Sequence, residues 1–283
     1  TEREEDIRTS VWILKLQASP NNKGVYENKF TSQLVKEINE ALDYVLSNSN
    51  ESGSALVLTS EGKFFSNGHD IQALEYAVKE EAKLNQNEKI NGPASTFIRE
   101  FYQLLARFMV LPIFTVAAIN GHAFAGGCLL AMAQDARVMR SDRGFICMNE
   151  IDLALFAPKP RPGEKESPIK PGLFKDADMK MMSVLLAKLP IPFVREIVLT
   201  GKRYDGVQAA NASRFGASLV DAAVEGEENM LNKAIEMAKE LAKKSPPRNR
   251  RTVSVLKYEL VRQYLLLLTE GADPISSGIA SSL

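Results

Sequence analysis

Residues 112–150 read PIFTVAAINGHAFAGGCLLAMAQDARVMRSDRGFICMNE, and this stretch decides how the chain folds. It opens with an apolar run at 113–119 that is rich in β-forming residues and predicts a buried strand. Glycine-containing turns follow, and residues 128–133 then form a helix-like run. A second strand-like run covers 136–139, and the stretch ends at the acidic Glu150. Strand, helix and strand in this order are typical of an α/β fold.

The chain before this stretch continues the same alternation. Strands are predicted at 11–16 and 55–59, and a short aromatic strand at about 63–66 runs into a turn. Amphipathic helices are predicted at 30–46 and 97–109 from apolar residues at helical spacing. Asp70 is a candidate N-cap for a further helix at 71–78. Neither a G-x-G-x-x-G fingerprint after a strand nor a P-loop motif is present, so a nucleotide-binding fold of either kind is not indicated.

The chain changes character after this stretch. Residues 159–178 are rich in proline and lysine, and they predict a long exposed loop. Helices are then predicted at 179–189, 192–199, 207–212, 227–243 and 250–268, with one short strand at 215–220. We therefore expect an α/β core at 1–178, which includes the loop 159–178, and a helical C-terminal region at 179–283.

Composition excludes several classes of function. The 283 residues carry 35 basic and 35 acidic side chains, so no overall field attracts nucleic acid or an anionic membrane. The short basic run at 248–251 is the only feature that favours nucleic acid, and no apolar run reaches the roughly 20 residues that span a bilayer. Two cysteines and two histidines in no ligand pattern predict neither a disulfide scaffold nor a metal site.

Two glycine turns each follow an apolar strand and are the candidate chemical features. The first contains Gly68 and His69, and the second contains Gly126 and Gly127. Glycine permits backbone conformations and close approaches that a side chain forbids. Two such turns side by side can direct two N–H groups at one oxygen, which is the arrangement of an oxyanion hole.

These turns also carry a resemblance. The phrases FFSNGHDI at 64–71, VAAINGHAFAGGCLLAMAQDARV at 116–138 and GFICMNEIDLAL at 144–155 resemble the crotonase superfamily of enoyl-CoA hydratases and isomerases. The resemblance covers residues 10–157 and resumes more diffusely over 179–243. It implies an α/β fold, a spiral of ββα units in two roughly perpendicular sheets, with a helical C-terminal region that builds trimers or dimers of trimers.

The resemblance further implies an acyl-CoA thioester as substrate and no separate cofactor or metal. The thioester oxygen would lie between the backbone N–H groups of His69 and Gly126, so that His69 acts through its main chain. The residues implied in substrate binding are those of the two turns: Asn67, Gly68, His69, Asp70, Ile71, Gly126 and Gly127.

The acidic residues determine the implied subtype. Hydratases of the family carry a glutamate directly after Gly-Gly-Cys and a second one downstream, whereas this chain has Leu129 at the first position and Glu150 at the second. One base with an oxyanion hole suits a proton shuttle. The pattern resembles the Δ3,Δ2-enoyl-CoA isomerases, in particular the peroxisomal plant-type members. Glu150 would move a proton from C2 to C4, with a pKa raised by the apolar residues 145, 146 and 148, while Asp152 is expected to be structural.

Two other functions stay open from the sequence. One is an enoyl-CoA hydratase whose second acid comes from elsewhere, against which Leu129 argues. The other is an inactive family member that serves as a binding protein, supported only by the unusual residues after 156.

The C-terminal residues Ser281, Ser282 and Leu283 resemble the peroxisomal address S-K-L, although the middle residue is not basic. A polar tail without a targeting role is the alternative reading of these three residues. We expect a peroxisomal location, and a cytosolic one otherwise.

Overall fold

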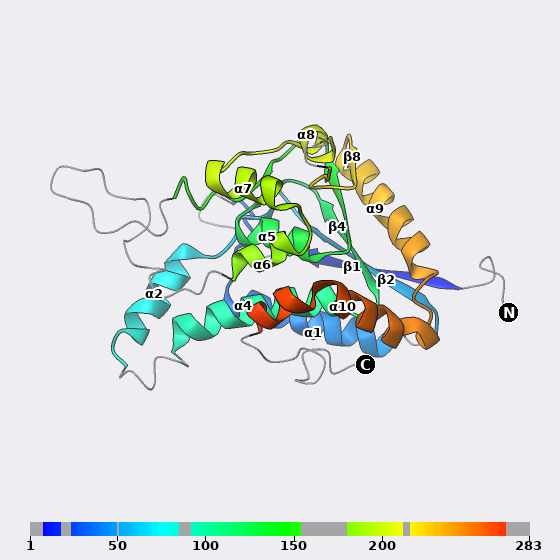
Figure 1. The fold of residues 1–283 in the computed structure, drawn as a ribbon, viewed down its shortest axis with the longest axis horizontal. Helices are drawn as coiled ribbons and strands as arrows, with labels where there is room; N and C mark the ends of the chain where they lie inside the picture. The colour runs from blue at the N-terminus through cyan, green and yellow to red at the C-terminus, as the bar shows by residue number, and fades with distance from the viewer. Residues whose placement is uncertain are drawn as a thin grey trace.

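The structure is a computed structural model, and it describes residues 8–17, 24–49, 51–84, 92–153, 180–211 and 216–269. The predicted loop at 159–178 and the terminal residues 281–283 lie outside these ranges. Within them, two parallel sheets are surrounded by helices (Figure 1). This arrangement confirms the α/β class expected from the alternating strands and helices.

The large sheet has five parallel strands in the order β1-β2-β4-β6-β8. They are β1 (Thr9–Leu16), β2 (Gly53–Ser60), β4 (Phe114–Ile119), β6 (Ala136–Arg140) and β8 (Ala222–Val224). All eight residues of β2 are buried, which explains its continuous apolar sequence, because a central parallel strand is covered on both faces. Helix α9 (Glu227–Ala242) covers one face with Met230 and a stripe of alanines, packed on the valines and alanines of β2, β4 and β6.

The small sheet has three short parallel strands in the order β3-β5-β7. They are β3 (Phe64–Ser66), β5 (His122–Phe124) and β7 (Ile146–Cys147). The aromatic strand before the first glycine turn is thus confirmed as β3. Strands β5 and β7 have three and two residues, too few for any hydrophobic period to mark them in the sequence.

Helices of the first half begin and end close to where the periodicity places them. They are α1 (Ser32–Asn48), α2 (Ile71–Glu81), α4 (Pro93–Val110) and α5 (Gly126–Ala133). Thr31 caps α1 by accepting from the Leu34 N–H at 3.2 Å, and Asp70 caps α2 by accepting from the N–H groups of Gln72 and Ala73. Every residue of α5 is buried, and this short central helix packs against α4.

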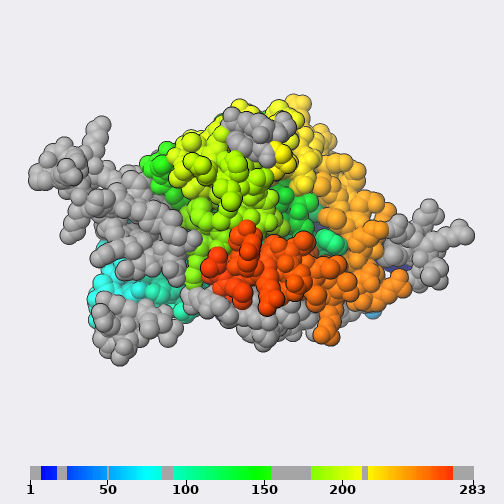
Figure 2. Space-filling view, in the orientation of Figure 1, coloured from blue at the N-terminus to red at the C-terminus, as the bar shows by residue number. Residues whose placement is uncertain are grey.

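The second half is mostly helical, as expected. Its elements besides β8 and α9 are α6 (Met181–Leu186), α7 (Ile191–Thr200), α8 (Gly206–Ala210), the 3-10 turn η3 (Pro247–Asn249) and α10 (Arg250–Leu268). Helix α10 packs on α4 and α6, and it crosses the middle of the face in Figure 2 with α6 and α7 above it. None of the helices in the described residues is both long and apolar enough to cross a membrane.

The strand predicted at 215–220 is wrong. Leu219 and Val220 are buried and made the segment look like a strand, but both of their N–H groups point to the Ala209 carbonyl at the end of α8. The chain joins the large sheet only at Ala222, which pairs with Val138. The two buried apolar residues Leu219 and Val220 therefore resemble a strand in the sequence, although the strand β8 begins only at Ala222.

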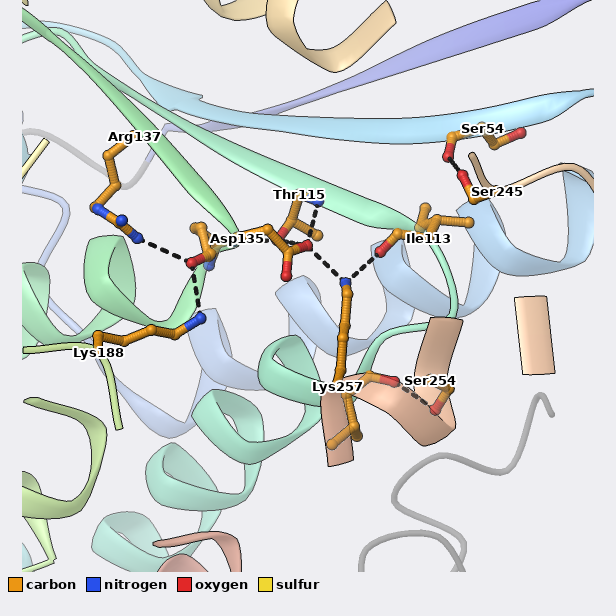
Figure 3. A network of polar contacts seen from close by, with 11 residues as sticks. Ser54, Ile113, Thr115, Asp135, Arg137, Lys188, Ser245, Ser254 and Lys257 are labelled. Carbon is orange, nitrogen blue, oxygen red and sulfur yellow. Dashed lines mark hydrogen bonds and ion pairs between the residues drawn. The ribbon is translucent and has the colours of Figure 1, made fainter. Parts of the chain in front are cut away.

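A buried polar network ties the C-terminal helix to the large sheet (Figure 3). Lys257 on α10 donates to the Ile113 carbonyl at 2.8 Å and to an Asp135 carboxylate oxygen at 2.6 Å. The same carboxylate accepts from the Thr115 N–H at 2.8 Å. Although burial lowers the pKa of the Lys257 ammonium, the Asp135 charge opposes that shift. The network therefore holds α10 in one register against β4 and β6, since an unpaired buried charge is costly.

Candidate active site

The candidate residues gather at one edge of the small sheet. The strands β3, β5 and β7 are parallel, so their carboxyl ends lie at the same edge. The first glycine turn leaves β3, the second leaves β5, and Glu150 follows β7 by three residues. Three segments that are widely separated in sequence thus meet because the short strands pair in this order.

The first turn is held on its outer side by the chain around Phe30. The Phe30 N–H donates to the Gly68 carbonyl at 2.8 Å, and the Asp70 N–H donates to the Phe30 carbonyl at 2.9 Å. The intervening His69 N–H therefore points away from Phe30, because successive N–H groups of an extended chain alternate in direction. That is the side on which β5 and the second turn lie.

The second turn brings the chain of Gly126 against the first turn. A Cβ placed on Gly68, whose φ is +77°, would lie 3.2 Å from the Gly126 nitrogen and 3.2 Å from the Phe124 carbonyl oxygen. A Cβ placed on Gly127 would lie 2.3 Å from the Ser66 carbonyl oxygen. Both positions therefore require glycine, and the two turns are in direct backbone contact.

Ala125, at the start of the second turn, has a strained backbone that the sequence did not reveal. Its φ of 49° with ψ of −116° is unusual for a residue with a Cβ. Its N–H donates to the Cys147 carbonyl at 3.1 Å, which anchors the turn to β7. Strain of this kind concentrates at functional sites, where the surrounding structure maintains it.

Two backbone N–H groups are available at this junction. Gly126 is the first residue of α5, and the first N–H groups of a helix have no intrahelical partner. Within the described residues no acceptor is bonded to the N–H of His69 or of Gly126. The positive end of the α5 dipole adds to the attraction for a negatively charged oxygen placed there.

Glu150 has an environment that suits a base. Burial raises the pKa of its carboxyl from 4.5 to about 7, a shift opposed only by its own backbone N–H. No lysine or arginine of the described residues forms an ion pair with it. Burial is the largest cause that raises the pKa of the Cys128 and Cys147 thiols, and the Glu150 charge adds to it. The Glu150 carboxyl group therefore lies near α5 and the end of β7.

The remaining candidates take supporting positions. Asn67 is tied to Glu27 by its backbone N–H at 2.9 Å and its side chain at 3.2 Å, and Asp70 is the cap of α2, which begins at Ile71. Asp152 is exposed, and a Cβ on Gly201 would lie 3.1 Å from its carboxylate, so it lies beside the turn after α7.

The side chains that follow Gly127 on α5 and end β7 are apolar or thiols. Cys128, Cys147 and Leu129 are all buried, as expected of packing residues. No cluster of histidine, cysteine and acidic side chains in the described part of the chain could hold a metal ion.

Sequence reasoning missed the surroundings of the His69 side chain. Its ring lies against Phe30, Phe97 and Phe101, with ring centroids 6.0, 5.3 and 4.4 Å apart. The spacing of Phe97 and Phe101 marked them as packed helix residues, but their contact with His69 is non-local and left no signal in the sequence. A separate cavity of about 530 Å³ lies between α1 and α4 and is lined by none of the candidate residues.

Comparison with known proteins adds independent findings. A model of the family described as enoyl-CoA hydratase/isomerase matches residues 7–270. The peroxisomal enoyl-CoA delta isomerase 1 of Arabidopsis thaliana is 35% identical over 151 residues, covering 53% of this chain and 55% of that protein, about half of its length. The peroxisomal enoyl-CoA delta isomerase 2 of the same plant is 30% identical over 220 residues, covering 77% of this chain and 78% of that protein.

A solved structure shares the fold. A probable enoyl-CoA hydratase, EchA3, from Mycobacterium tuberculosis H37Rv matches with a TM-score of 0.69 and 21% identity, over 96% of this chain and 94% of that one. At this identity the likeness concerns the fold alone, and it agrees with the fold class that the family resemblance implied.

Proposed function

Because the chain belongs to the enoyl-CoA hydratase/isomerase family, we propose that it is a Δ3,Δ2-enoyl-CoA isomerase that moves a 3-cis or 3-trans double bond of an acyl-CoA to the 2-trans position. The names of two relatives favour isomerisation over hydration. The observation that carries the proposal is the half-buried Glu150, whose pKa of about 7 suits a base and whose carboxyl group lies near α5, where residue 129 is a leucine.

The proposed reaction needs one base and one stabilised oxygen. Glu150 removes a proton from C2 of the acyl chain, and the electrons spread into a dienolate. The N–H groups of His69 and Gly126 donate hydrogen bonds to the thioester oxygen as its negative charge grows. Glu150 then returns the proton at C4, which gives the conjugated 2-trans product without a net change of atoms.

Leu129 separates this proposal from hydration. Adding water across a double bond requires one group to activate the water and another to move the second proton. Leu129 is buried on α5 and cannot transfer a proton. Neither neighbouring carboxylate is placed to be the second acid of a hydratase, since Asp70 caps α2 and Asp152 is exposed beside Gly201.

The proposal is tested by turnover of 3-hexenoyl-CoA, followed at the absorbance of the conjugated enoyl thioester. The expected result is a rise in absorbance, together with no loss of conjugated absorbance when crotonyl-CoA is the substrate. Water addition to crotonyl-CoA would identify a hydratase instead. Tight binding of acyl-CoA with no turnover of either compound would identify an inactive binding protein.

The pKa of Glu150 predicts the pH dependence of the proposed activity. A base acts in its ionised form, so kcat/KM is expected to be low below the folded-state pKa of about 7 and to level off above it. Below that value the rate should fall about tenfold per pH unit. The check is a pH profile of kcat/KM on 3-hexenoyl-CoA, and a profile whose acid limb lies near pH 4.5 would contradict a catalytic carboxylate with a raised pKa.

An assembly of several copies also fits the surface. Helix α10 exposes Leu256, Leu260 and Leu267, with 60%, 82% and 58% of their areas accessible, and α7 exposes Ile191 at 64% and Leu199 at 59%. Exposed apolar side chains of this size on the two helices that pack against α6 favour an interface. We propose a homotrimer or a dimer of trimers; light scattering that gives the mass of one chain would exclude it.

A peroxisomal location is proposed from the names of the two Arabidopsis relatives. The Ser-Ser-Leu terminus at 281–283 is the segment to test for a targeting role. A fluorescent protein fused ahead of this terminus should enter peroxisomes, and deletion of residues 281–283 should keep it in the cytosol. Unchanged distribution after the deletion would show that the terminus is not the signal.

A further inference from the structure

The side chain of His69 has a chemical environment that its main-chain role does not explain. Three phenylalanine rings surround it at centroid distances of 4.4 to 6.0 Å, and all three pairs are edge-type contacts. Its Nε2 is buried and has no hydrogen-bond partner among the described residues. A phenylalanine would fill such a space at no polar cost, whereas a buried polar atom without a partner destabilises the fold.

The ring is neutral and is directed toward the second turn. Burial alone lowers the pKa of the His69 imidazole to about 4, and no charged group opposes the shift. At neutral pH one ring nitrogen therefore carries a hydrogen and the other a lone pair. The second nitrogen, Nδ1, lies 3.3 Å from the position that a Cβ on Gly126 would occupy.

The two nitrogens differ in what they can reach. Buried N–H groups without an acceptor are rarer in proteins than buried acceptors without a donor. We therefore assign the hydrogen to Nδ1 and the lone pair to the buried Nε2, which has no hydrogen-bond partner among the described residues. Gly126 has no side chain, so the space on the Nδ1 side of the imidazole is bounded by the N-terminus of α5.

We propose that the Nδ1–H of His69 is a third hydrogen-bond donor to the thioester oxygen, beside the backbone N–H groups of His69 and Gly126. The inference rests on the proposed function, because it takes the acyl-CoA oxygen as the acceptor. A neutral donor stabilises the enolate without fixing a counter-charge in the site. It acts only when the oxygen becomes negative, so its effect is on kcat more than on KM.

Three substitutions of His69 separate a donor from a packing residue. His69→Phe keeps an aromatic ring and the main-chain N–H but removes both ring nitrogens. His69→Asn places an amide nitrogen on the same carbon that carries Nδ1, and His69→Gln places one at about the distance of Nε2. Circular dichroism and thermal unfolding of each variant establish that it is folded before it is compared.

The readout is the equilibrium ionisation of a bound 3-oxoacyl-CoA, acetoacetyl-CoA, whose enolate has a near-ultraviolet absorbance that the keto form lacks. His69→Asn is expected to keep the enolate fraction of the wild type within about threefold. His69→Phe and His69→Gln are expected to lower the ratio of enolate to keto form, and kcat on 3-hexenoyl-CoA, by about 10- to 100-fold with little change in KM.

Several outcomes would overturn the inference. An unchanged enolate fraction in His69→Phe would show that the ring only packs. If His69→Gln kept the enolate fraction of the wild type and His69→Asn lowered it, the donor would be Nε2 and not Nδ1. If all three variants lowered the enolate fraction equally, the role of the His69 side chain would be steric.

The enolate measurement does not depend on turnover, so it separates the inference from the proposed function. If the wild type binds acetoacetyl-CoA and forms its enolate but does not isomerise 3-hexenoyl-CoA, the proposed function fails and the donor role stands. If the wild type does not bind the acyl-CoA at all, both fail together.

Discussion

Replacing Glu150 by glutamine is expected to lower kcat for 3-hexenoyl-CoA by at least about 10³-fold. Glutamine has nearly the same shape, but its amide cannot accept the C2 proton. Partial burial raises the pKa of the Glu150 carboxyl to about 7, so a large share of it is ionised at neutral pH and ready to act as a base. Affinity for a non-reacting acyl-CoA, measured by calorimetry, should stay within about threefold because the amide adds no charge and little volume.

Asp152→Asn is the matched control for this variant. The change is chemically the same and lies two residues downstream, but Asp152 is exposed and lies beside Gly201. Its activity should stay within about twofold of the wild type, as surface substitutions usually do. If Glu150→Gln retained turnover comparable to Asp152→Asn, Glu150 would be removed from the mechanism.

Gly127→Ala is expected to destabilise the fold by about 3 kcal/mol, the upper range for overpacking a buried site. The new Cβ would lie 2.3 Å from the Ser66 carbonyl oxygen and 2.9 Å from the Ser66 carbonyl carbon. Ser66 is fully buried and bonded to the Asn28 carbonyl at 2.7 Å, so it has little freedom to move. Because the contact joins the two glycine turns, the same change should separate the N–H groups of His69 and Gly126 and lower kcat.

Helix propensity alone predicts that Gly127→Ala stabilises the fold, which is opposite to the effect expected from the close contact. The sign of the measured change therefore distinguishes the two. Alanine inside a helix is favoured over glycine by about 1 kcal/mol. Gly126→Ala serves as the comparison for stability, because the three atoms nearest to its Cβ would be side-chain atoms of His69, Phe30 and Phe101, each at 3.3 Å. Denaturant unfolding should place Gly126→Ala nearer to the wild type than Gly127→Ala. A Gly127→Ala protein as stable as the wild type would contradict the close contact of the two turns.

The elements that the sequence predicted well are those with a long and clean period. Helix α10 begins and ends where its amphipathic pattern does, and β2 reads as a continuous apolar strand because both faces are covered. The strands β5 and β7 are too short to show a period, yet they bring the two turns and Glu150 to one edge. The order of the motifs was therefore visible in the sequence, but the pairing that assembles them was not.

The sequence proposed the residues of the candidate site but revealed little of their surroundings. The raised pKa of Glu150 was expected from the apolar residues that precede it, and Ile146 and Met148 are indeed buried. Phe145 is exposed instead, and its ring stacks on His122 at 5.7 Å. The aromatic enclosure of His69 joins residues about 30 to 40 positions apart, and no local pattern encodes such contacts.

The most direct test of a single-carboxylate shuttle is the fate of the hydrogen that leaves C2. 3-Hexenoyl-CoA deuterated at C2 should give 2-trans-hexenoyl-CoA with part of the deuterium at C4 when the product of a single turnover is analysed by mass spectrometry and NMR. This is expected because Glu150 is half-buried and forms no ion pair in the described residues that could relay the proton to solvent. Product that carries no deuterium at C4 would contradict transfer of the proton by one carboxyl group.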